Sequence, residues 1–338
     1  MSNEYRVLEF FSGIGGMHYA LQAADKKYEV LQAFDINEVA NKVYSYNLNT
    51  PVSEANLDSI TAKKLNKFNA NLFLMSPPCQ PYTRTGVQLA DKDPRAKSFL
   101  NFLKLLPDLK SLNYFLIENV QGFENSPTHA LLIKACEENG FKYQQFLLNP
   151  LHLGIPNSRL RFYFLAKRDN LPDFEFQELN DIIFHSDKES NDLSKLDSDS
   201  FQRAIEWFKL TKDFNSTLND YLGESLSKVE LLDLRSIPEK TFNRYYQVYD
   251  IVTPESTGSC CFTKGYSSYA EATGSILKIN TEEGEKFRYF DSMEIAKLMG
   301  FPEEFKFPDD LTFKVQCRLL GNSLNVKVVA KLLEYLLD

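Results

Sequence analysis

A cysteine stands in the middle of the segment SPPCQP, residues 76–81, directly after a short apolar run. The three prolines each fix their own φ near −65°, so this segment is stiff. A solitary cysteine is more often a small buried hydrophobe than a reactive group. A loop with three prolines does not easily turn its thiol into a core. We therefore interpret Cys79 as a candidate nucleophile.

Other charged groups could assist such a nucleophile. Glu118 closes the apolar run 114–117, where partial desolvation would make its carboxyl available as an acid. Arg159 and Arg161 alternate, so at the start of a strand they would share one face. Two neighbouring guanidinium groups suit an anion and could lower the pKa of a thiol. The alternatives are a strand-end cap for Glu118 and a solvated surface pair for the arginines.

A glycine-rich turn, Ser12 to Gly16, joins a strand-like run to a helical pattern. Glycines let the backbone approach a ligand, and a helix N-terminus offers free N–H groups. The turn is not G-x-G-x-x-G, so the dinucleotide fingerprint is absent. Asp35 ends the second strand-like run, where an acid typically holds ribose hydroxyls, and Asp58 follows the third. Each acid alone could be a cap, but together these positions favour an adenosine-containing ligand at the carboxyl edge of a sheet.

Strand-like and helix-like patterns alternate over the first 168 residues, and they would position these groups. This alternation predicts βαβ units and a mostly parallel, Rossmann-like α/β sheet. The predicted strands cover residues 5–11, 30–34, 72–75, 114–117 and 161–166, and the predicted helices cover 17–25, a segment capped by Asn37, 95–106 and 129–138.

The pattern changes after residue 170, which suggests a discontinuous large domain. Residues 1–170 would form its first part, 171–287 a smaller and less regular domain, and 288–338 the return to the large one. The stretch 178–199 carries seven acids against two bases and reads as a solvated connection. Further helices are predicted at 201–210, 291–299 and 323–337.

Composition excludes several classes. The chain has 338 residues, 43 % of them hydrophobic, which is enough for a full core. It has no apolar run of membrane-spanning length and no secretory leader pattern, so we expect a cytoplasmic protein, with the nucleus as a second compartment. Five cysteines without a C-x-x-C and only four histidines suggest neither a zinc site nor a disulfide framework. A net charge of −8 argues against charge-driven nucleic-acid binding but leaves room for a local basic cleft.

Taken together, the motifs resemble the cytosine-5 methyltransferases, in order and over nearly the whole chain. The matching segments are FSGIGG (11–16), PPCQ (77–80), ENV (118–120), the two arginines of RLR (159–161), RYFDSMEIAKLMGFP (288–302) and GNS (321–323). The resemblance implies S-adenosylmethionine as cofactor, S-adenosylhomocysteine as product and Cys79 as nucleophile. It places around the cofactor Ser12, Gly13, Ile14, Gly15, Gly16, Asp35, Ile36, Leu57, Asp58, Ser76, Asn322 and Ser323.

The chemistry of that family explains the constellation. A thiolate that adds to C6 turns cytosine into an enamine whose C5 can accept a methyl group. Negative charge then moves toward N3 and O2 of the ring. We expect Glu118 to serve N3, Arg159 to serve O2 and Arg161 to support the loop around them.

A narrower resemblance concerns the smaller domain. The segment CFTKGYSSYAEATGS, residues 261–275, is similar to the signature of the DNA methyltransferase 2 family, the tRNA aspartic-acid methyltransferases. That resemblance implies methylation of a cytosine in a tRNA anticodon loop, and it makes 171–287 a compact target-recognition domain. The family's G-T-G-S is here Ala272-Thr273-Gly274-Ser275, and the lost glycine stiffens this turn. Candidate RNA contacts are Arg84, Arg95, Lys97, Lys264 and Tyr266, although each could equally be solvated.

Three rivals stay open or fail. DNA is the rival substrate, and a cofactor-binding RNA-binding protein without turnover is the rival class. Intact Cys79, Glu118 and Arg159 argue against the second. A dinucleotide oxidoreductase fails on the missing fingerprint and on the unexplained cysteine loop. We expect a monomer that binds neither a metal nor a membrane.

Overall fold

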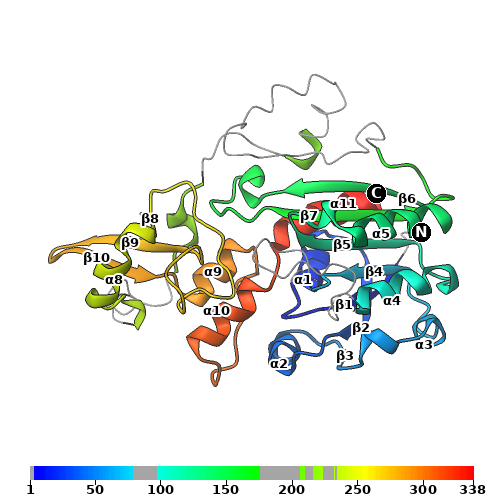
Figure 1. The fold of residues 1–338 in the computed structure, drawn as a ribbon, viewed down its shortest axis with the longest axis horizontal. Helices are drawn as coiled ribbons and strands as arrows, with labels where there is room; N and C mark the ends of the chain where they lie inside the picture. Colours follow the sequence, from blue (N-terminus) through cyan, green and yellow to red (C-terminus); the bar gives the residue numbers. More distant parts are fainter. Residues whose placement is uncertain (1–3, 79–96, 176–205, 210–215, 224–231, 233) are drawn as a thin grey trace. The chain divides into compact units, whose positions relative to one another are not determined.

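A seven-stranded sheet in the order β3-β2-β1-β4-β5-β7-β6 dominates the first part of the computed structural model (Figure 1). The structure describes residues 4–78, 97–175, 206–209, 216–223, 232 and 234–338. The strands are β1 (Tyr5–Phe10), β2 (Tyr28–Phe34), β3 (Val52–Ser53), β4 (Leu72–Met75), β5 (Tyr114–Val120), β6 (Phe141–Leu148) and β7 (Arg161–Arg168).

Parallel pairing prevails, as the alternating pattern predicted. β1 pairs in parallel with β2 and β4, and β2–β3 and β4–β5 are parallel too. Among the described strands of this seven-stranded sheet, only the β7 pairings, with β5 and β6, are antiparallel. Strand β6 was not predicted. The mostly parallel α/β sheet is therefore confirmed, with an antiparallel edge.

The connecting helices begin and end close to the predicted positions. They are α1 (Gly16–Ala23), α2 (Glu38–Asn47), α4 (Lys97–Leu105), α5 (Pro127–Glu138) and α11 (Val326–Leu337). A further helix, α3 (Ala62–Asn66), was not predicted. The Asn37 side chain accepts hydrogen bonds from the backbone N–H groups of Val39 and Ala40 and so caps α2 as expected. Asn56 and Ser126 cap η1 (Leu57–Ser59) and α5 in the same way.

Contacts along the chain divide it into two units. Unit 1 comprises Met1–Leu148, Leu160–Phe208 and Val328–Asp338, and unit 2 comprises Asn149–Arg159 and Lys209–Lys327. The chain thus returns to unit 1 at Val328, whereas the sequence placed the return of the catalytic domain at residue 288. The functional domain boundaries 1–170, 171–287 and 288–338 stay a prediction.

The core of unit 1 follows from strand alternation. Phe10 and Phe73 on neighbouring strands pack with ring centroids 5.1 Å apart, and Phe115 packs on Phe102 of α4 at 5.7 Å. These rings belong to one buried cluster that also includes residues of α5. The opposite face receives α11, where the Tyr335 hydroxyl donates to Gln144 Oε1 at 2.7 Å. Both faces are buried, as expected for parallel strands.

The carboxyl ends of β1 and β4 lie side by side, because Phe10 pairs with Met75 in the parallel register. β1 is the strand at which the strand order reverses, with β2 on one side and β4 on the other. Ligands of open α/β sheets bind beside such a switch point, at the carboxyl edge. The glycine turn and the PPCQ segment both begin at this edge.

Unit 2 contains a three-stranded sheet in the order β10-β9-β8 and several short helices. Its elements are η7 (Pro150–Leu153), η9 (Leu218–Tyr221), α8 (Glu239–Tyr245), η10 (Tyr246–Val248), β8 (Asp250–Val252), β9 (Ser275–Thr281), β10 (Gly284–Tyr289), α9 (Ser292–Leu298) and α10 (Phe313–Gly321). β9 pairs with β10 antiparallel and with β8 in parallel.

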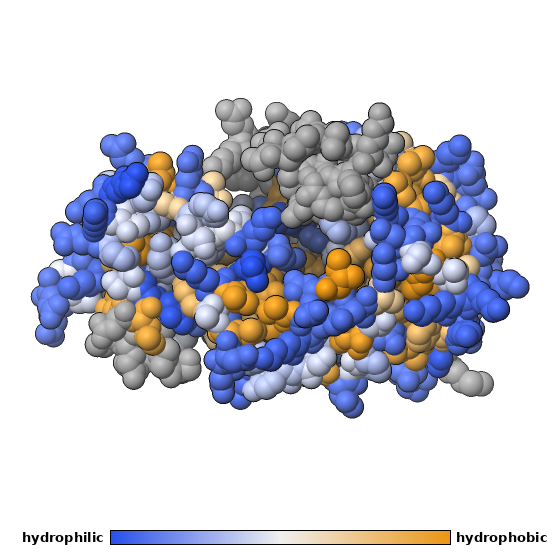
Figure 2. Space-filling view, turned by 60° about the horizontal axis from the view of Figure 1, so that its bottom comes forward, coloured by the Kyte–Doolittle hydropathy of each residue, from blue (hydrophilic) through white to orange (hydrophobic). Residues whose placement is uncertain are grey.

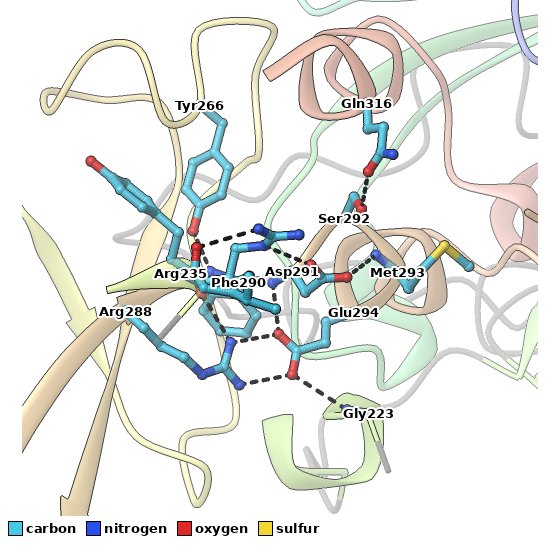
Figure 3. A network of polar contacts seen from close by, with 12 residues as sticks. Gly223, Arg235, Tyr266, Arg288, Phe290, Asp291, Ser292, Met293, Glu294 and Gln316 are labelled. Carbon is cyan, nitrogen blue, oxygen red and sulfur yellow. Dashed lines mark hydrogen bonds and ion pairs between the residues drawn. The ribbon is translucent and has the colours of Figure 1, made fainter. Parts of the chain in front are cut away.

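A polar network fastens β10 to α9 in unit 2 (Figure 3). Arg288 forms a bidentate ion pair with Glu294 at 2.7 and 2.8 Å, and both side chains are 2 % exposed. Glu294 also accepts from the backbone N–H of Asp291, which caps α9 through the N–H of Met293. The capping box and the ion pair share the Glu294 carboxylate. This carboxylate therefore fixes the turn that connects β10 to α9 within the segment RYFDSMEIAKL.

Three structural features bear on partners. No helix in the described ranges has the length and apolar content to cross a bilayer. The described residues contain no group of three or more histidine, cysteine or acidic side chains able to hold a metal ion. On the face drawn in Figure 2, hydrophilic residues cover most of the surface and hydrophobic ones form smaller patches.

Candidate active site

The glycine turn after β1 is sharply bent. Phe11, Gly13 and Gly15 all have positive φ, at 56°, 54° and 90°. A Cβ on Gly15 would lie 2.6 Å from Leu48 Cδ1, so no larger residue fits there without movement. Around Gly13, by contrast, no atom of the described residues lies within 4 Å of an added Cβ. The turn is therefore packed against α2 on one side and open on the other.

Asp35 holds this turn in place. Its two carboxylate oxygens accept from the backbone N–H groups of Gly13 and Asn37, each at 2.8 Å. Burial raises the pKa of Asp35 above its usual value, while the backbone N–H donors act in the opposite direction. The next residue, Ile36, is 75 % exposed, which is unusual for a large aliphatic side chain at a strand end.

Two buried hydroxyls lie at the ends of the neighbouring strands β1 and β4. Within the part of the chain that the structure describes, neither Ser12 Oγ nor Ser76 Oγ has a hydrogen-bond partner. Their backbones are fixed, because Ser12 N donates to Phe34 O at 3.1 Å and Ser76 N to Phe10 O at 3.3 Å. Buried polar groups are normally paired, so these two are suited to a polar ligand.

The Leu57–Asp58 pair lies on η1. Asp58 is exposed and accepts a hydrogen bond from the hydroxyl of Ser98 on α4. Leu57 is 6 % exposed and belongs to the core, and its carbonyl accepts from the Asn101 side chain at 2.9 Å. Its side chain therefore packs inward, whereas Asp58 is accessible to a ligand.

Glu118 meets Arg161 on one face of the antiparallel pair β5–β7. Val120 pairs with Arg161 and Glu118 with Tyr163, so the two charged side chains are diagonal neighbours. Arg161 Nε lies 3.5 Å from Glu118 Oε1, and their side chains are 17 % and 11 % exposed. A carboxyl and a guanidinium thus stand together at the carboxyl end of β5.

Arg159 has different surroundings, in unit 2. Its guanidinium donates to the carbonyls of Phe262 (3.1 Å) and Gly321 (3.2 Å) and to that of Ser323. Arg159 is only 4 % exposed. Arg159 thus contacts loop backbone in unit 2, whereas Arg161 lies beside the Glu118 carboxyl, and the roles expected of the two arginines stay predictions. The premise that they share a strand face was wrong, because β7 begins at Arg161.

The comparisons with known proteins identify the family of the chain. The C-5 cytosine-specific DNA methylase model matches residues 5–338. The chain belongs to this family. The tRNA (cytosine(38)-C(5))-methyltransferase of Mus musculus is 40 % identical over 98 % of this chain and 93 % of its own length. The DNA (cytosine-5)-methyltransferase of Dictyostelium discoideum is 38 % identical over 99 % of this chain and 95 % of its own length.

A solved structure of a Spodoptera frugiperda DNMT2 mutant covers 99 % of this methylase and all of that chain. Its sequence identity is 37 % and its TM-score 0.81. The cytosine-5 methyltransferase class and the Rossmann-like methyltransferase fold, both predicted from the motifs, are confirmed.

The family implies S-adenosylmethionine as methyl donor, and the residues at the carboxyl edge of unit 1 fit it. The open side of the glycine turn, the two unpartnered hydroxyls of Ser12 and Ser76 and the exposed Ile36 suit a ligand with both polar and apolar parts. Asn322 and Ser323, the other predicted cofactor contacts, lie in unit 2 at the end of α10. Asn322 is exposed, and Ser323 N donates to Leu320 O at 2.9 Å.

The structure covers only part of the other predicted positions. Cys79, Arg84 and Arg95 lie outside the described residues. Lys97 is exposed at the first residue of α4, and Lys264 is exposed in unit 2. Each is accessible to a phosphate, as predicted, and their roles stay predictions.

Tyr266 requires a correction. Its ring is 1 % exposed, and its hydroxyl donates to Ser275 O at 2.8 Å. The same hydroxyl accepts from Phe290 N at 2.8 Å (Figure 3). A base cannot reach a ring in that position. Tyr266 is therefore a packing residue of this methylase, and its ring points inward and contacts the ring of Phe262.

Asn119, the middle residue of Glu-Asn-Val, was not selected from the sequence. It is 2 % exposed, and its side-chain amide donates to Pro77 O at 3.3 Å. This bond fixes the backbone two residues before Cys79. The signal was available, since Asn119 belongs to a motif whose neighbour Glu118 was chosen, but an amide offers no titratable group to attract attention.

Glu9 was also missed. It is fully buried in β1 and accepts from the Tyr44 hydroxyl at 2.9 Å, which in turn contacts His18 Nδ1 at 2.9 Å. Burial raises the pKa of Glu9 to about 8 and lowers the pKa of His18 to about 4. Hydrogen bonds among Glu9, Tyr44 and His18 thus connect β1, α2 and α1 around the glycine turn. A lone acid inside the apolar run VLEFF was the visible signal.

Proposed function

We propose that this chain methylates C5 of a cytosine in the anticodon loop of a tRNA, with tRNA-Asp as the expected substrate. The observation that carries the proposal is the 40 % identity, over nearly the full chain, to a relative named as a tRNA (cytosine(38)-C(5))-methyltransferase. The paired Glu118 and Arg161 at the carboxyl edge of unit 1 supply the polar groups that this chemistry needs.

Cys79 would act as the nucleophile. Its thiolate adds to C6 of the cytosine, and the bond formed makes C5 electron-rich. After C5 is methylated, loss of the C5 proton to a base would break the C6–S bond and release the thiolate. Negative charge develops toward N3 and O2 of the ring during that addition. Glu118, protonated or sharing a proton, would serve N3, and Arg161 would stabilise the charge at O2. Their separation of 3.5 Å supports joint action on one edge of a base.

Two residues would position this machinery without touching the base. Asn119 holds Pro77 and so restricts the start of the Cys79 loop. Arg159 holds the backbones of Phe262, Gly321 and Ser323 in unit 2. Rigid support of this kind matters because small misplacements of a reacting group cost large factors in rate.

Cofactor binding is proposed for the edge residues of unit 1 and for the end of α10. The former are Ser12, Gly13, Ile14, Gly15, Gly16, Asp35, Ile36, Leu57, Asp58 and Ser76, and the latter are Asn322 and Ser323. Leu57 would contribute its backbone region only, because its side chain is in the core. S-adenosylmethionine, when bound, supplies an electrophilic methyl group.

A tRNA loop suits such a pocket energetically. The target base must leave its stack before a thiol can reach C6. An unpaired base in a loop is cheaper to extrude than a paired base of a duplex. DNA is the second candidate, since the matching family model describes DNA methylases and the Dictyostelium relative is named as one.

The test measures transfer of labelled methyl groups from S-adenosylmethionine. Purified protein is offered tRNA-Asp, the same tRNA with uridine at position 38, and duplex DNA. Cys79→Ala is the matched control, which should bind S-adenosylmethionine like the parent. Label that enters only the unchanged tRNA, and is lost in Cys79→Ala, is the expected result.

The other outcomes separate the rivals. Label in DNA but not in tRNA would keep the mechanism and replace the substrate. Label in neither, with intact tRNA and cofactor binding, would make the chain a binding protein without turnover. Turnover retained by Cys79→Ala would remove Cys79 as the nucleophile.

A further inference from the structure

We propose that Tyr269 is a stacking platform for an unpaired base of the RNA substrate. The inference rests on the proposed tRNA function and names a contact surface for it. Tyr269 lies in the segment 261–275 and is 72 % exposed, whereas Tyr266 of the same segment is 1 % exposed. We therefore assign the base contact in this loop to the exposed Tyr269 instead of the buried Tyr266.

The two ends of the loop are fastened to each other. Thr263 N donates to Thr273 O at 2.9 Å, and Cys260 N donates to Ser275 Oγ at 2.7 Å. A Cβ on Gly321 would lie 2.2 Å from both the nitrogen of Lys264 and the carbonyl carbon of Thr263. The first residues of the loop thus press directly on the end of α10, with no side chain between them.

The inner side of the loop is filled. Phe262 and Tyr266 pack with ring centroids 5.0 Å apart. The Tyr266 hydroxyl both donates and accepts a hydrogen bond. A Cβ on Gly274 would lie 2.7 Å from Phe262 and 2.8 Å from Tyr266. This packing leaves the loop little freedom to move.

The backbone of Tyr269 is fixed although its ring is exposed. Its N–H donates to Gly265 O at 3.0 Å, and its carbonyl accepts from Thr273 Oγ1 at 2.7 Å. The ring edge lies beside Gly265, where an added Cβ would be 3.1 Å from Tyr269 Cδ2. A tyrosine on a fixed backbone has only two side-chain torsions to restrict on binding, which favours its use as a contact.

Backbone strain also marks this loop. Ser267 and Ala272 have φ of 63° and 53°, in the left-handed region that non-glycine residues rarely adopt. Strain of this kind persists where surrounding structure enforces it, and it concentrates at functional sites. The two strained residues stand on either side of Tyr269 in the sequence.

The polar surroundings favour nucleic acid over an apolar partner. Exposed Lys264 precedes Gly265, on which the Tyr269 ring lies, and it offers a cation for a phosphate. Exposed Glu271 offers an acceptor for the amino group of a base. Aromatic stacking beside a cation is the usual recognition mode for single-stranded nucleic acid, because every base has a π-face.

The experiment compares Tyr269→Ala, Tyr269→Phe and Tyr46→Ala. Tyr46 on α2 in unit 1 is 57 % exposed and serves as a matched surface tyrosine. Dissociation constants for tRNA-Asp and for S-adenosylmethionine are measured at one salt concentration, together with tRNA methylation by the parent. Tyr269→Ala should weaken tRNA binding by about 5- to 150-fold. Tyr269→Phe and Tyr46→Ala should stay within about twofold of the parent, and cofactor affinity should not change.

The outcomes are distinguishable. If the parent methylates tRNA and Tyr269→Ala binds tRNA as tightly as the parent, the inference falls alone, and the exposed ring would be assigned to a protein partner. If Tyr269→Phe loses as much affinity as Tyr269→Ala, stacking is not the interaction. If the parent neither binds nor methylates tRNA, the proposed function fails and takes this inference with it.

Discussion

Arg161 on β7 and Glu118 on β5 face each other, with Arg161 Nε 3.5 Å from Glu118 Oε1. The guanidinium of Arg159, two residues away, instead donates hydrogen bonds to backbone carbonyls. We expect Arg161→Gln to lower kcat for tRNA methylation by about 10²–10³-fold, the usual cost of removing a donor that stabilises developing charge. Cofactor affinity, measured by calorimetry, should change little because the cofactor residues are untouched.

Arg159→Gln is the matched variant. It should lower the free energy of unfolding in urea by about 2–4 kcal/mol, because buried carbonyls lose a charged donor. Activity per folded molecule should exceed that of Arg161→Gln. A variant at 159 that unfolds like the parent yet has no turnover would restore Arg159 as the cation at the base.

Ala272 predicts a stabilising substitution. Its φ of 53° suits glycine, the residue that the related pattern has at this position. Ala272→Gly should raise the free energy of unfolding by about 0.5–1 kcal/mol, since relief of left-handed strain exceeds the added entropy of the unfolded chain. Gly274→Ala should have the opposite effect, because the new Cβ would lie 2.7 Å from Phe262. Equal midpoints for parent and Ala272→Gly in urea would contradict the strain.

Glu9 predicts a pH dependence of stability. Burial raises its pKa to about 8, so the folded protein keeps the proton in a range where the unfolded chain, near 4.5, has lost it. Between these values the unfolded state binds fewer protons, and stability therefore falls as pH rises. Among its neighbours, Tyr44 stays protonated, His18 is neutral above about pH 4, and the negative charge of Asp35 opposes ionisation of Glu9.

The measurement is the free energy of unfolding in urea from pH 5 to 8. In Glu9→Gln the decline with pH should be shallower, by at most about 1.4 kcal/mol per pH unit. Glu137→Gln, an exposed substitution on α5, should reproduce the parent curve. Parallel curves for Glu9→Gln and the parent would mean that Glu9 ionises normally.

We expect loss of the buried ion pair Arg288–Glu294 to destabilise the protein far more than loss of an exposed ion pair. Glu294→Ala should cost about 3–5 kcal/mol in unfolding free energy, because it leaves the Arg288 charge buried at 2 % exposure. Glu283→Ala, which breaks the exposed pair with Lys286, should cost at most about 1 kcal/mol. Similar losses in thermal melts of both variants would show that burial does not decide the value of these pairs.

Much of the sheet was predictable because parallel strands are buried on both faces and so read as continuous apolar runs. Leu72–Met75 and Tyr114–Ile117 are of this kind. Strand β6 escaped because Lys142, Gln144 and Gln145 interrupt its pattern, and it lies at the sheet edge beside β7. An edge strand needs no continuous apolar run, so periodicity alone does not reveal it.

The positions of site residues were predictable where a strand end determines them. They were not predictable where side-chain packing determines them. The glycine turn, Asp35 and Glu118 all lie where their strands end. The different surroundings of the two arginines were not predicted, because alternation applies only inside a strand and Arg159 precedes β7. Which tyrosine of the loop faces inward depends on packing against Gly274 and on a hydrogen bond from the Phe290 backbone, and neither contact follows from sequence periodicity.

The Tyr5 hydroxyl donates to Leu337 O at 2.9 Å, and the two ends of unit 1 lie close together (Figure 1). Unit 2 is inserted between them in the sequence, and α11 follows it. During translation, the sheet of unit 1 must therefore wait for one covering helix until all of unit 2 has left the ribosome. The part of the sheet that α11 covers lacks this helix over that interval, and completion of unit 1 is coupled to synthesis of unit 2.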